Sequence, residues 1–216
     1  MSEKLNHAHH ASIFHPRDAK PTTIIGVGAV GSLVADALSK VGVRDITVWD
    51  NDTVASHNCS MSLYRPQDVG KLKVCALAEI LEQHSGIVPK THECDYRGEA
   101  LRHTSVVACV HSMPARKLIW DSVLMNPSVD IFCDSRTGGA YIEVYAINPC
   151  DRRDIDRYQS LLFEESERTE HSCGNHGIIY GSLTAASAVV ANLTRYWKTG
   201  EKQWRYALRS DMLSPA

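Results

Sequence analysis

A glycine cluster near the start of the chain constrains the fold more than any other feature. Its spacing is G-x-G-x-x-G, and it stands between a β-branched run over residues 22–27 and an apolar stripe at helical spacing over residues 29–41. Glycine permits a tight turn and lets a phosphate approach the backbone, while the helix N-terminus supplies amide donors. The pattern predicts a strand, a phosphate-binding turn and a helix. The turn residues expected at the phosphates are Gly26, Gly28, Ala29, Val30 and Gly31.

Strand and helix patterns alternate along the rest of the chain. Short apolar or alternating runs indicate strands at 22–27, 45–50, 87–94, 105–110, 129–134, 140–147 and 204–208. Helical spacing of apolar residues indicates helices at 29–41, 70–84, 114–124 and 177–197. Such alternation predicts an α/β, Rossmann-like fold with a mostly parallel sheet and helices on both faces. Antiparallel strands are expected to be added near the C-terminal half.

The chain has 216 residues, enough for one sizeable domain, which we place at residues 21–210. Two segments lack the apolar pattern of a core. Residues 1–20 are polar, and residues 151–172 mix acidic and basic side chains densely. We expect the first to be a mobile N-terminal segment and the second a mobile loop.

Charge and cysteine content exclude several classes of protein. The formal net charge is 23 − 25 = −2, which does not favour nucleic acid or an anionic membrane as a partner. No apolar run approaches the roughly 20 residues of a membrane span. Seven cysteines occur without any C-x-x-C pair, so we expect neither a disulfide framework nor a zinc site. A reducing cytoplasm is the expected compartment.

Polar residues after the glycine turn narrow the choice of nucleotide. Asp50 follows Gly31 by nineteen residues and ends the second strand, where a carboxylate accepts hydrogen bonds from ribose hydroxyls. This much fits either NAD or ATP. Asp52, Asn58 and Lys73 then supply a second acid, an amide and a cation near the same turn. This set suits a triphosphate with its metal better than a nicotinamide cofactor.

The residues quoted so far carry a resemblance to a known family. The string GVGAVGSLVADALSKVGVRDITVWDNDTV, with the later HN and DVGKLKV, resembles the ThiF/MoeB/HesA family, prokaryotic relatives of ubiquitin-activating enzymes. The resemblance covers roughly residues 22–198. It implies a ThiF-like domain that uses ATP and Mg²⁺ to adenylate the C-terminal glycine of a ubiquitin-fold carrier protein. It also implies a homodimer.

The resemblance assigns roles by position. Gly28 and Gly31 would face the phosphates, Asp50 would bind the ribose, and Asp52, Asn58 and Lys73 would surround the phosphates and metal. Asp52 would hold magnesium, with Asp134 as a second candidate ligand. Cys173 precedes a glycine and an apolar helix, as does a cysteine that takes part in acyl or sulfur transfer in some members. Arg17 would reach the nucleotide of a partner subunit. Residues with candidate catalytic roles are therefore Lys73, Cys173, Arg17 and His111.

The sequence departs from the family pattern at two places. The arginine expected shortly after Asn58 is missing, and Arg65 is a candidate replacement. His111 stands where the family has an aspartate that helps to hold magnesium, and imidazole suits that ion poorly. Position 111 is open to three interpretations: a tolerated variation, a weakened enzyme or an introduced substitution. Arg116, which follows, is expected to fix the corner between strand and helix.

Three functions remain open from sequence. The first is adenylation of a ubiquitin-like or sulfur-carrier protein, with a possible thioester or acyl transfer through Cys173. The second is a nucleotide-binding or partner-binding module that has lost catalysis, with His111 as its mark. The third is an NAD-binding oxidoreductase, which leaves Lys73 and Asp52 unexplained.

Overall fold

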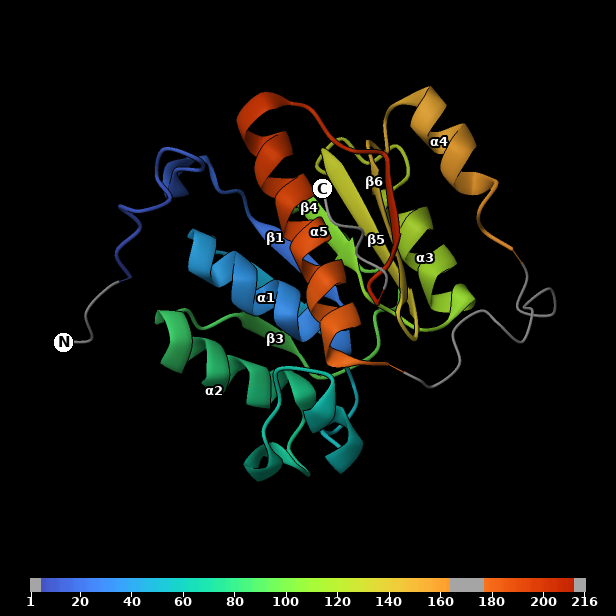
Figure 1. The fold of residues 1–216 in the computed structure, drawn as a ribbon. Coiled ribbons are helices and arrows are strands. Elements are labelled where there is room, and N and C mark those ends of the chain that lie inside the picture. The colour runs from blue at the N-terminus through green and yellow to red at the C-terminus, as the bar shows by residue number, and fades with distance from the viewer. Residues whose placement is uncertain (1–4, 164–176, 212–216) are drawn as a thin grey trace.

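The computed structural model describes residues 5–163 and 177–211, which form seven strands in one sheet (Figure 1). The strand order is β3-β2-β1-β4-β5-β6-β7. The first five of these pair in parallel, and β6 and β7 pair antiparallel. The strands are β1 (Thr22–Ile25), β2 (Ile46–Trp49), β3 (Lys90–His92), β4 (Ser105–Ala108), β5 (Ile131–Gly138), β6 (Tyr141–Ile147) and β7 (Arg205–Arg209). The expected mixed sheet is confirmed.

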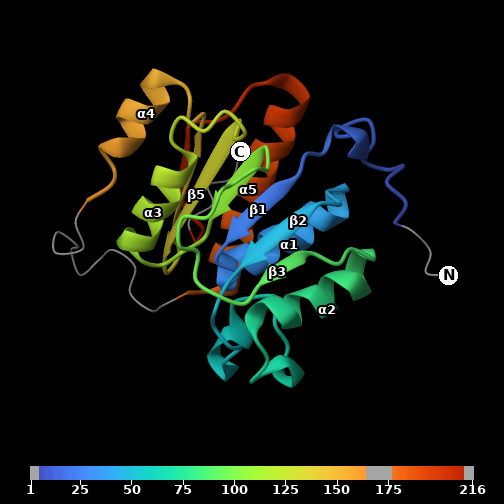
Figure 2. The same cartoon turned by 180° about the vertical axis from the view of Figure 1, so that it is seen from behind.

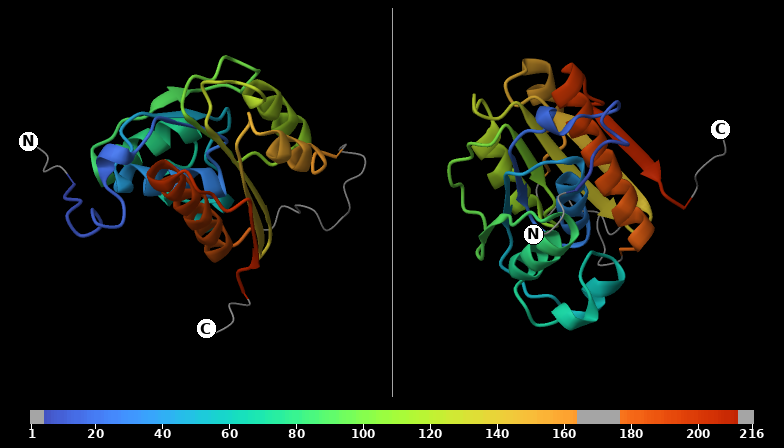
Figure 3. Two further views of the ribbon diagram at one scale, coloured as in Figure 1. Left: turned by 90° about the horizontal axis from the view of Figure 1, so that it is seen from above. Right: turned by 90° about the vertical axis from the view of Figure 1, so that its left-hand side faces the viewer.

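Helices cover both faces of the sheet, as Figures 1 and 2 show from opposite sides. One apolar cluster joins one face to α1, α2 and α5, and a second joins the other face to α3 and α4. Seen from above, the sheet separates the two layers (Figure 3). The helices are α1 (Ala29–Val41), α2 (Lys73–Ser85), α3 (Met113–Val123), α4 (Arg152–Gln159) and α5 (Ile179–Thr199). Three 3-10 turns lie at η1 (Pro16–Asp18), η2 (Ser56–Ser60) and η3 (Pro66–Asp68).

The expectation of a mobile loop at 151–172 is wrong for the first part of this segment, which forms α4. Asp151 caps α4 through its side chain, which accepts from the amides of Arg153 and Asp154. Ile155 and Tyr158 are buried in the cluster below α3 and α4. The charges that suggested a loop therefore belong to the solvent face of an amphipathic helix. Residues 164–172 lie outside the described residues.

The N-terminal segment is also partly attached to the domain. Phe14 is buried, and its ring lies 6.0 Å from that of Trp197 on α5. Lys198 donates a hydrogen bond to the carbonyl of Ile13. The expectation that residues 1–20 are mobile throughout therefore does not hold at Phe14, because its aromatic ring packs against α5.

No helix within residues 5–163 and 177–211 is long and apolar enough to cross a membrane.

Candidate functional site

A cavity of about 460 Å³ opens at the carboxyl ends of β1, β2 and β4. This is the edge at which ligands bind to open parallel sheets. Its walls come from four segments: the start of the glycine turn, the end of β2, residues 94–96 after β3, and the start of α3. The lining includes Gly26, Asp50, Asp52, Asp95, Tyr96, Val110, His111 and Ser112.

Glycine is sterically required at two positions of the turn, and at a third position a side chain would meet open space. Gly26 has φ +86°, and a Cβ on it would lie 2.6 Å from the carbonyl oxygen of Cys109. A Cβ on Gly31 would lie 2.0 Å from the carbonyl oxygen of Gly26. A Cβ on Gly28, by contrast, would meet no atom of the described chain within 4 Å. Gly26 and Gly31 allow the close approach of turn, strand and helix. Gly28 leaves room for a ligand beside the first turn of α1.

Asp50 is fixed at the end of β2 by the backbone around it. One carboxylate oxygen accepts from the amide of Val27 at 2.8 Å, and the other accepts from the amide of Asp52 at 3.0 Å. Burial raises the pKa of Asp50 above its ordinary value, although nearby Lys73 and these amides oppose the shift. Each oxygen keeps a second lone pair, so the carboxylate can still accept hydroxyl groups of a sugar.

Lys73 extends from the first position of α2 toward the two acids. Its Nζ lies 2.6 Å from Asp52 and 3.9 Å from Asp50. The lysine side chain is 10% exposed, whereas that of Asp52 is 58% exposed. The structure thus brings together the three charged residues that the sequence suggested around one nucleotide.

Tyr64, which the sequence interpretation missed, connects the glycine turn to α2. Its hydroxyl donates to the carbonyl of Val27 at 2.6 Å and lies 3.2 Å from the carbonyl of Lys73. Burial raises the pKa of Tyr64 far above its usual range, so the hydroxyl stays protonated and acts as a donor. The signal in the sequence was a tyrosine in a polar loop, which has no spacing that would single it out.

Aromatic residues on the far wall of the cavity were also missed. Trp49 stacks on His92 with ring centroids 3.7 Å apart, and its other contact is edge-on with Tyr96 at 5.5 Å. Asp95, which is exposed, adds a third carboxylate to the rim. Trp49 ends β2 and His92 ends β3, whereas Asp95 and Tyr96 follow β3. The position of β3 beside β2 depends on strand order and not on local sequence.

Asn58 lies outside the cavity lining, although the sequence placed it near the phosphates. Its side-chain oxygen accepts from the amide of Ala55 and closes the turn η2. Arg65, the candidate replacement for the missing family arginine, also lies outside the cavity lining. It binds the buried carboxylate of Asp68 and the side chain of Gln83 on α2. Both residues therefore stabilise the loop between β2 and α2.

The surroundings of Asp134 do not suit a metal ligand. It is fully buried, and its two oxygens accept from Arg116 at 2.7 Å and from Arg136 at 2.8 Å. Tyr158 donates a further bond at 2.9 Å. Burial alone would raise the pKa of Asp134, but the two arginines hold it below its usual range. Full burial outside the cavity lining and pairing with two arginines contradict the expectation that Asp134 holds magnesium.

Arg116 does fix the corner between β4 and α3. Besides Asp134, its guanidinium donates to the carbonyl of Val110 at 2.8 Å. His111 follows directly, is exposed, and lines the cavity. Ser112 caps α3, because its hydroxyl accepts from the amide of Ala115. The imidazole thus lies at the cavity mouth.

Arg17 lies at the opposite end of the domain from the cavity. It belongs to η1, which packs against Gly42 at the C-terminal end of α1, and its side chain is 77% exposed. Within its own chain it cannot reach the glycine turn, so a nucleotide contact requires a second copy. Cys173, the other candidate catalytic residue, lies outside the described residues.

The residues at the cavity fit ATP and one magnesium ion. Asp50 and Asp52 line the cavity. Gly28 and Lys73 lie beside this lining, where Gly28 leaves space at the amides of α1 and Lys73 supplies a cation next to both acids. Asp52 is the exposed carboxylate of this group, and Mg²⁺ commonly takes one or two protein carboxylates and completes its shell with phosphates and water. No cluster of three or more His, Cys, Asp or Glu residues that could cage a metal occurs in the described part of the chain.

Fold and site together define an α/β protein of the Rossmann-like class. A model of the ThiF family matches residues 18–199. The chain therefore belongs to the ThiF family.

Curated relatives match a short segment. Ubiquitin-like modifier-activating enzyme 5 of Oryza sativa is 38% identical over 66 residues, which are 31% of this chain and 15% of that protein. The Arabidopsis thaliana enzyme of the same name is 35% identical over 60 residues, 28% of this chain and 14% of that protein. The match thus spans about a sixth or less of these relatives.

Solved structures share the fold over most of the chain. Escherichia coli MccB in complex with ATP superposes with TM-score 0.71 at 15% identity, covering 92% of this chain and 64% of MccB. The E. coli tRNA N6-threonylcarbamoyladenosine dehydratase TcdA gives TM-score 0.70 at 14% identity, covering 89% of this chain and 94% of TcdA. At these identities the likeness concerns the fold.

Proposed function

We propose that this chain adenylates the C-terminal glycine of a ubiquitin-like or sulfur-carrier protein with Mg-ATP. One observation carries the proposal: Lys73 and Asp52 pair at 2.6 Å beside Asp50, above an open glycine turn. A pyrophosphate cofactor requires no such cation–carboxylate pair, whereas a triphosphate with its metal uses both members. Family membership and the activating enzymes among the relatives support the same chemistry.

The residues of the chain would mainly position the reactants and neutralise charge. Amides of the glycine turn would hold phosphate oxygens, and Asp50 would accept the ribose hydroxyls. Asp52 would contribute a ligand to magnesium, which neutralises phosphate charge when bound. Lys73 would leave Asp52 and approach the phosphates. Asp52 is the exposed member of this pair, so water can solvate its carboxylate once the buried Lys73 turns to the phosphates.

The reaction balances without any further reactant. A carboxylate oxygen of the terminal glycine attacks the α-phosphorus of ATP and forms a new P–O bond. The bond between the α-phosphorus and the bridging oxygen breaks, and pyrophosphate leaves with that electron pair. The product is an acyl adenylate. A thioester would follow if the thiolate of Cys173 attacked the acyl carbon and released AMP.

We further propose a homodimer in the cytoplasm, acting on a small carrier protein with a C-terminal glycine. The exposed position of Arg17, remote from the cavity of its own chain, is consistent with a contact across such a dimer. Nucleic acid is not proposed as a partner, in keeping with the small negative net charge.

His111 supports a second candidate function, a nucleotide-binding module with weakened or lost catalysis. The imidazole lines the cavity where the family pattern has a carboxylate, and buried Asp134 is committed to two arginines. On this alternative ATP binds but is not turned over. An NAD-dependent oxidoreductase is less favoured, because it gives Lys73 no role.

Pyrophosphate exchange tests the proposal directly. Purified protein, Mg-ATP, labelled pyrophosphate and a small carrier protein ending in Gly-Gly should produce carrier-dependent label in ATP. Lys73→Met should lower the exchange rate at least about 100-fold, because preorganised charge stabilisation contributes about 2.7–4 kcal/mol. Lys71→Met is the matched control and should exchange normally, since Lys71 pairs with Glu79 and Asp68, whereas Lys73 pairs with Asp52 and Asp50.

The outcomes separate the candidates. ATP binding without exchange in wild type, with exchange gained in His111→Asp, would favour the weakened module. Absence of ATP binding, together with binding of NADH, would refute both ATP-based proposals.

A further inference from the structure

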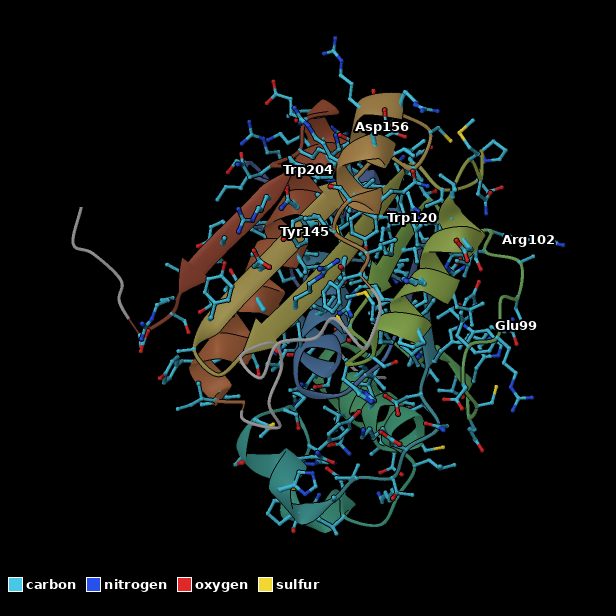
Figure 4. All side chains as sticks on the ribbon, turned by 90° about the vertical axis from the view of Figure 1, so that its right-hand side faces the viewer. Glu99, Arg102, Trp120, Tyr145, Asp156 and Trp204 are labelled. Atoms are coloured by element: carbon cyan, nitrogen blue, oxygen red, sulfur yellow. The ribbon has the colours of Figure 1, made fainter. Side chains whose placement is uncertain are left out.

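A second cavity, of about 660 Å³, lies on the α3/α4 side of the sheet and is rich in arginine and aromatic side chains. We call it the arginine cavity. Figure 4 shows Tyr145 on β6 and Trp204 just before β7 in this region, and their rings lie 6.1 Å apart. The residues that define the cavity for this argument are Arg136, Glu143, Tyr145, Arg157, Trp204 and Arg205.

The buried charges behind this cavity do not cancel. Asp134 accepts from both Arg116 and Arg136, so one carboxylate faces two guanidinium groups and the trio carries a net charge of +1. Burial would lower the pKa of Arg136, but the attraction of Asp134 outweighs it and leaves the pKa above its ordinary value. The guanidinium therefore keeps its charge at the cavity wall.

One donor of Arg136 is left without a partner. Its Nε binds Asp134, and its Nη1 donates to the carbonyl of Leu161 at 3.2 Å. Its Nη2 is buried and has no hydrogen-bond partner among the described residues. A buried, unpaired donor on a charged group is costly, and an anion in the cavity would offset the surplus charge.

The nearest acid on the neighbouring strand does not compensate for this. Glu143 is the cross-strand partner of Arg136, but its carboxylate binds Arg205 instead. The guanidinium groups of Arg136 and Arg157 each lie over an aromatic ring. Arg136 lies 5.1 Å from the ring centre of Tyr145, and Arg157 lies 5.8 Å from that of Trp204. Cation–π contacts orient such groups without neutralising them.

We propose that the arginine cavity binds a carboxylate side chain flanked by an apolar residue, carried by a peptide segment of the substrate protein. A carboxylate complements the surplus charge of Arg136 and the exposed guanidinium of Arg157, and the rings of Tyr145 and Trp204 provide a wall for the apolar neighbour. The proposal deepens the proposed function and rests on it for the identity of the peptide. It assigns to the substrate an acidic residue in addition to its C-terminal glycine.

A series of buried hydrogen bonds connects the arginine cavity to the nucleotide cavity. Arg116 donates to the carbonyl of Val110, which lines the first cavity, and shares Asp134 with Arg136, which lines the second. The chain Val110–Arg116–Asp134–Arg136 therefore fixes both walls in one rigid unit. A peptide held at Arg136 would be anchored relative to the end of β4.

Calorimetric titration of the whole protein tests the proposal without ATP. The probe is the capped peptide acetyl-Leu-Glu-Phe-amide, with acetyl-Leu-Gln-Phe-amide as the neutral match and inorganic phosphate as the alternative anion. We expect the Glu peptide to bind at least about tenfold more tightly than the Gln peptide. Arg136→Gln should abolish this preference, and it leaves Arg116 and Asp134 as a balanced pair. Arg153→Gln, on the exposed side of α4, should keep it.

Three outcomes would refute the inference. Equal binding of the Glu and Gln peptides, or no binding of either, would show that the cavity takes no carboxylate side chain. Tighter binding of phosphate would assign a different anion. Wild-type preference that survives in Arg136→Gln would place the site elsewhere. Carboxylate binding in a protein that performs no pyrophosphate exchange would leave the cavity assigned while the proposed adenylation fails.

Discussion

Two alanine substitutions in the glycine turn should have opposite effects on stability and on nucleotide binding. In Gly31→Ala the new Cβ would stand 2.0 Å from the carbonyl oxygen of Gly26, where real Cβ contacts essentially never fall below 3.0 Å. The turn must therefore move by at least 3.0 − 2.0 = 1.0 Å. The obstructing atom belongs to the backbone, so it cannot rotate away.

The magnitude follows from two opposing terms. Overpacking of a rigid site costs up to about 3 kcal/mol, and loss of glycine's freedom in the unfolded chain returns about 0.4–1 kcal/mol. A net loss of about 2 kcal/mol should lower Tm by about 4–8 °C for a domain of this size. In Gly28→Ala the Cβ meets nothing in the described chain, so stability should stay within about 1 kcal/mol of wild type.

ATP binding should respond in the Gly28→Ala variant, whose fold is retained. Its methyl group would occupy the space left for a phosphate at the first turn of α1, and loss of one charge-assisted hydrogen bond costs about 1.5–3 kcal/mol. This corresponds to at least about tenfold weaker binding. Differential scanning calorimetry and titration with Mg-ATP measure the two effects. A Gly31→Ala protein as stable as wild type would refute the turn geometry, and unchanged ATP affinity in Gly28→Ala would refute the phosphate site.

Three further substitutions test other parts of the structure. Tyr64→Phe should lower the free energy of unfolding by about 1–3 kcal/mol in urea titrations, because the carbonyl of Val27 loses its donor; no change would mean that the bond is absent. Asp134→Asn should cost about 3–5 kcal/mol at neutral pH, because two buried guanidinium groups lose their counter-charge. The fold lowers the pKa of Asp134, so its contribution is complete above the unfolded value of about 3.9 and is lost as the pH falls through the folded value; the variant should therefore show a flatter loss of Tm below about pH 4. Phe14→Ala should make residues near the N-terminus more sensitive to limited proteolysis, since the contact with Trp197 is lost; an unchanged cleavage rate would contradict that anchor.

The parallel core of the fold could be predicted because its signals are local. β-branched runs that end in turn residues mark β1, β2 and β4, and helical spacing marks α1, α2 and α5. Pro89 directly precedes β3, which lies at the edge of the sheet, where proline is tolerated. The helix α4 was missed although a capping aspartate and apolar residues at 155 and 158 were present, because dense charges on the solvent side obscured the stripe.

The site could be predicted where its residues follow one motif. The prediction failed where the partners of a residue come from distant elements. Asp50, Asp52 and Lys73 converge because the end of β2 and the start of α2 both adjoin the glycine turn. Asp134 was assigned to a metal because sequence shows a carboxylate at a strand end. It cannot show that Arg116 and Arg136, from either side along the chain, meet on that carboxylate.

The position of Asp134 also bears on His111. If His111 is a tolerated variation, another group must serve the metal in place of the missing carboxylate, and Asp52, Asp134 and water are the candidates. With Asp134 fully buried and engaged, Asp52 remains as the cavity carboxylate closest to Lys73. Magnesium would then rely on Asp52, phosphate oxygens and water, and Lys73 must release Asp52 before the ion binds. Metal dependence in this chain should therefore pass through Asp52, so that Asp52→Asn removes it, while Asp134→Asn changes stability and not the magnesium concentration needed for half-maximal exchange.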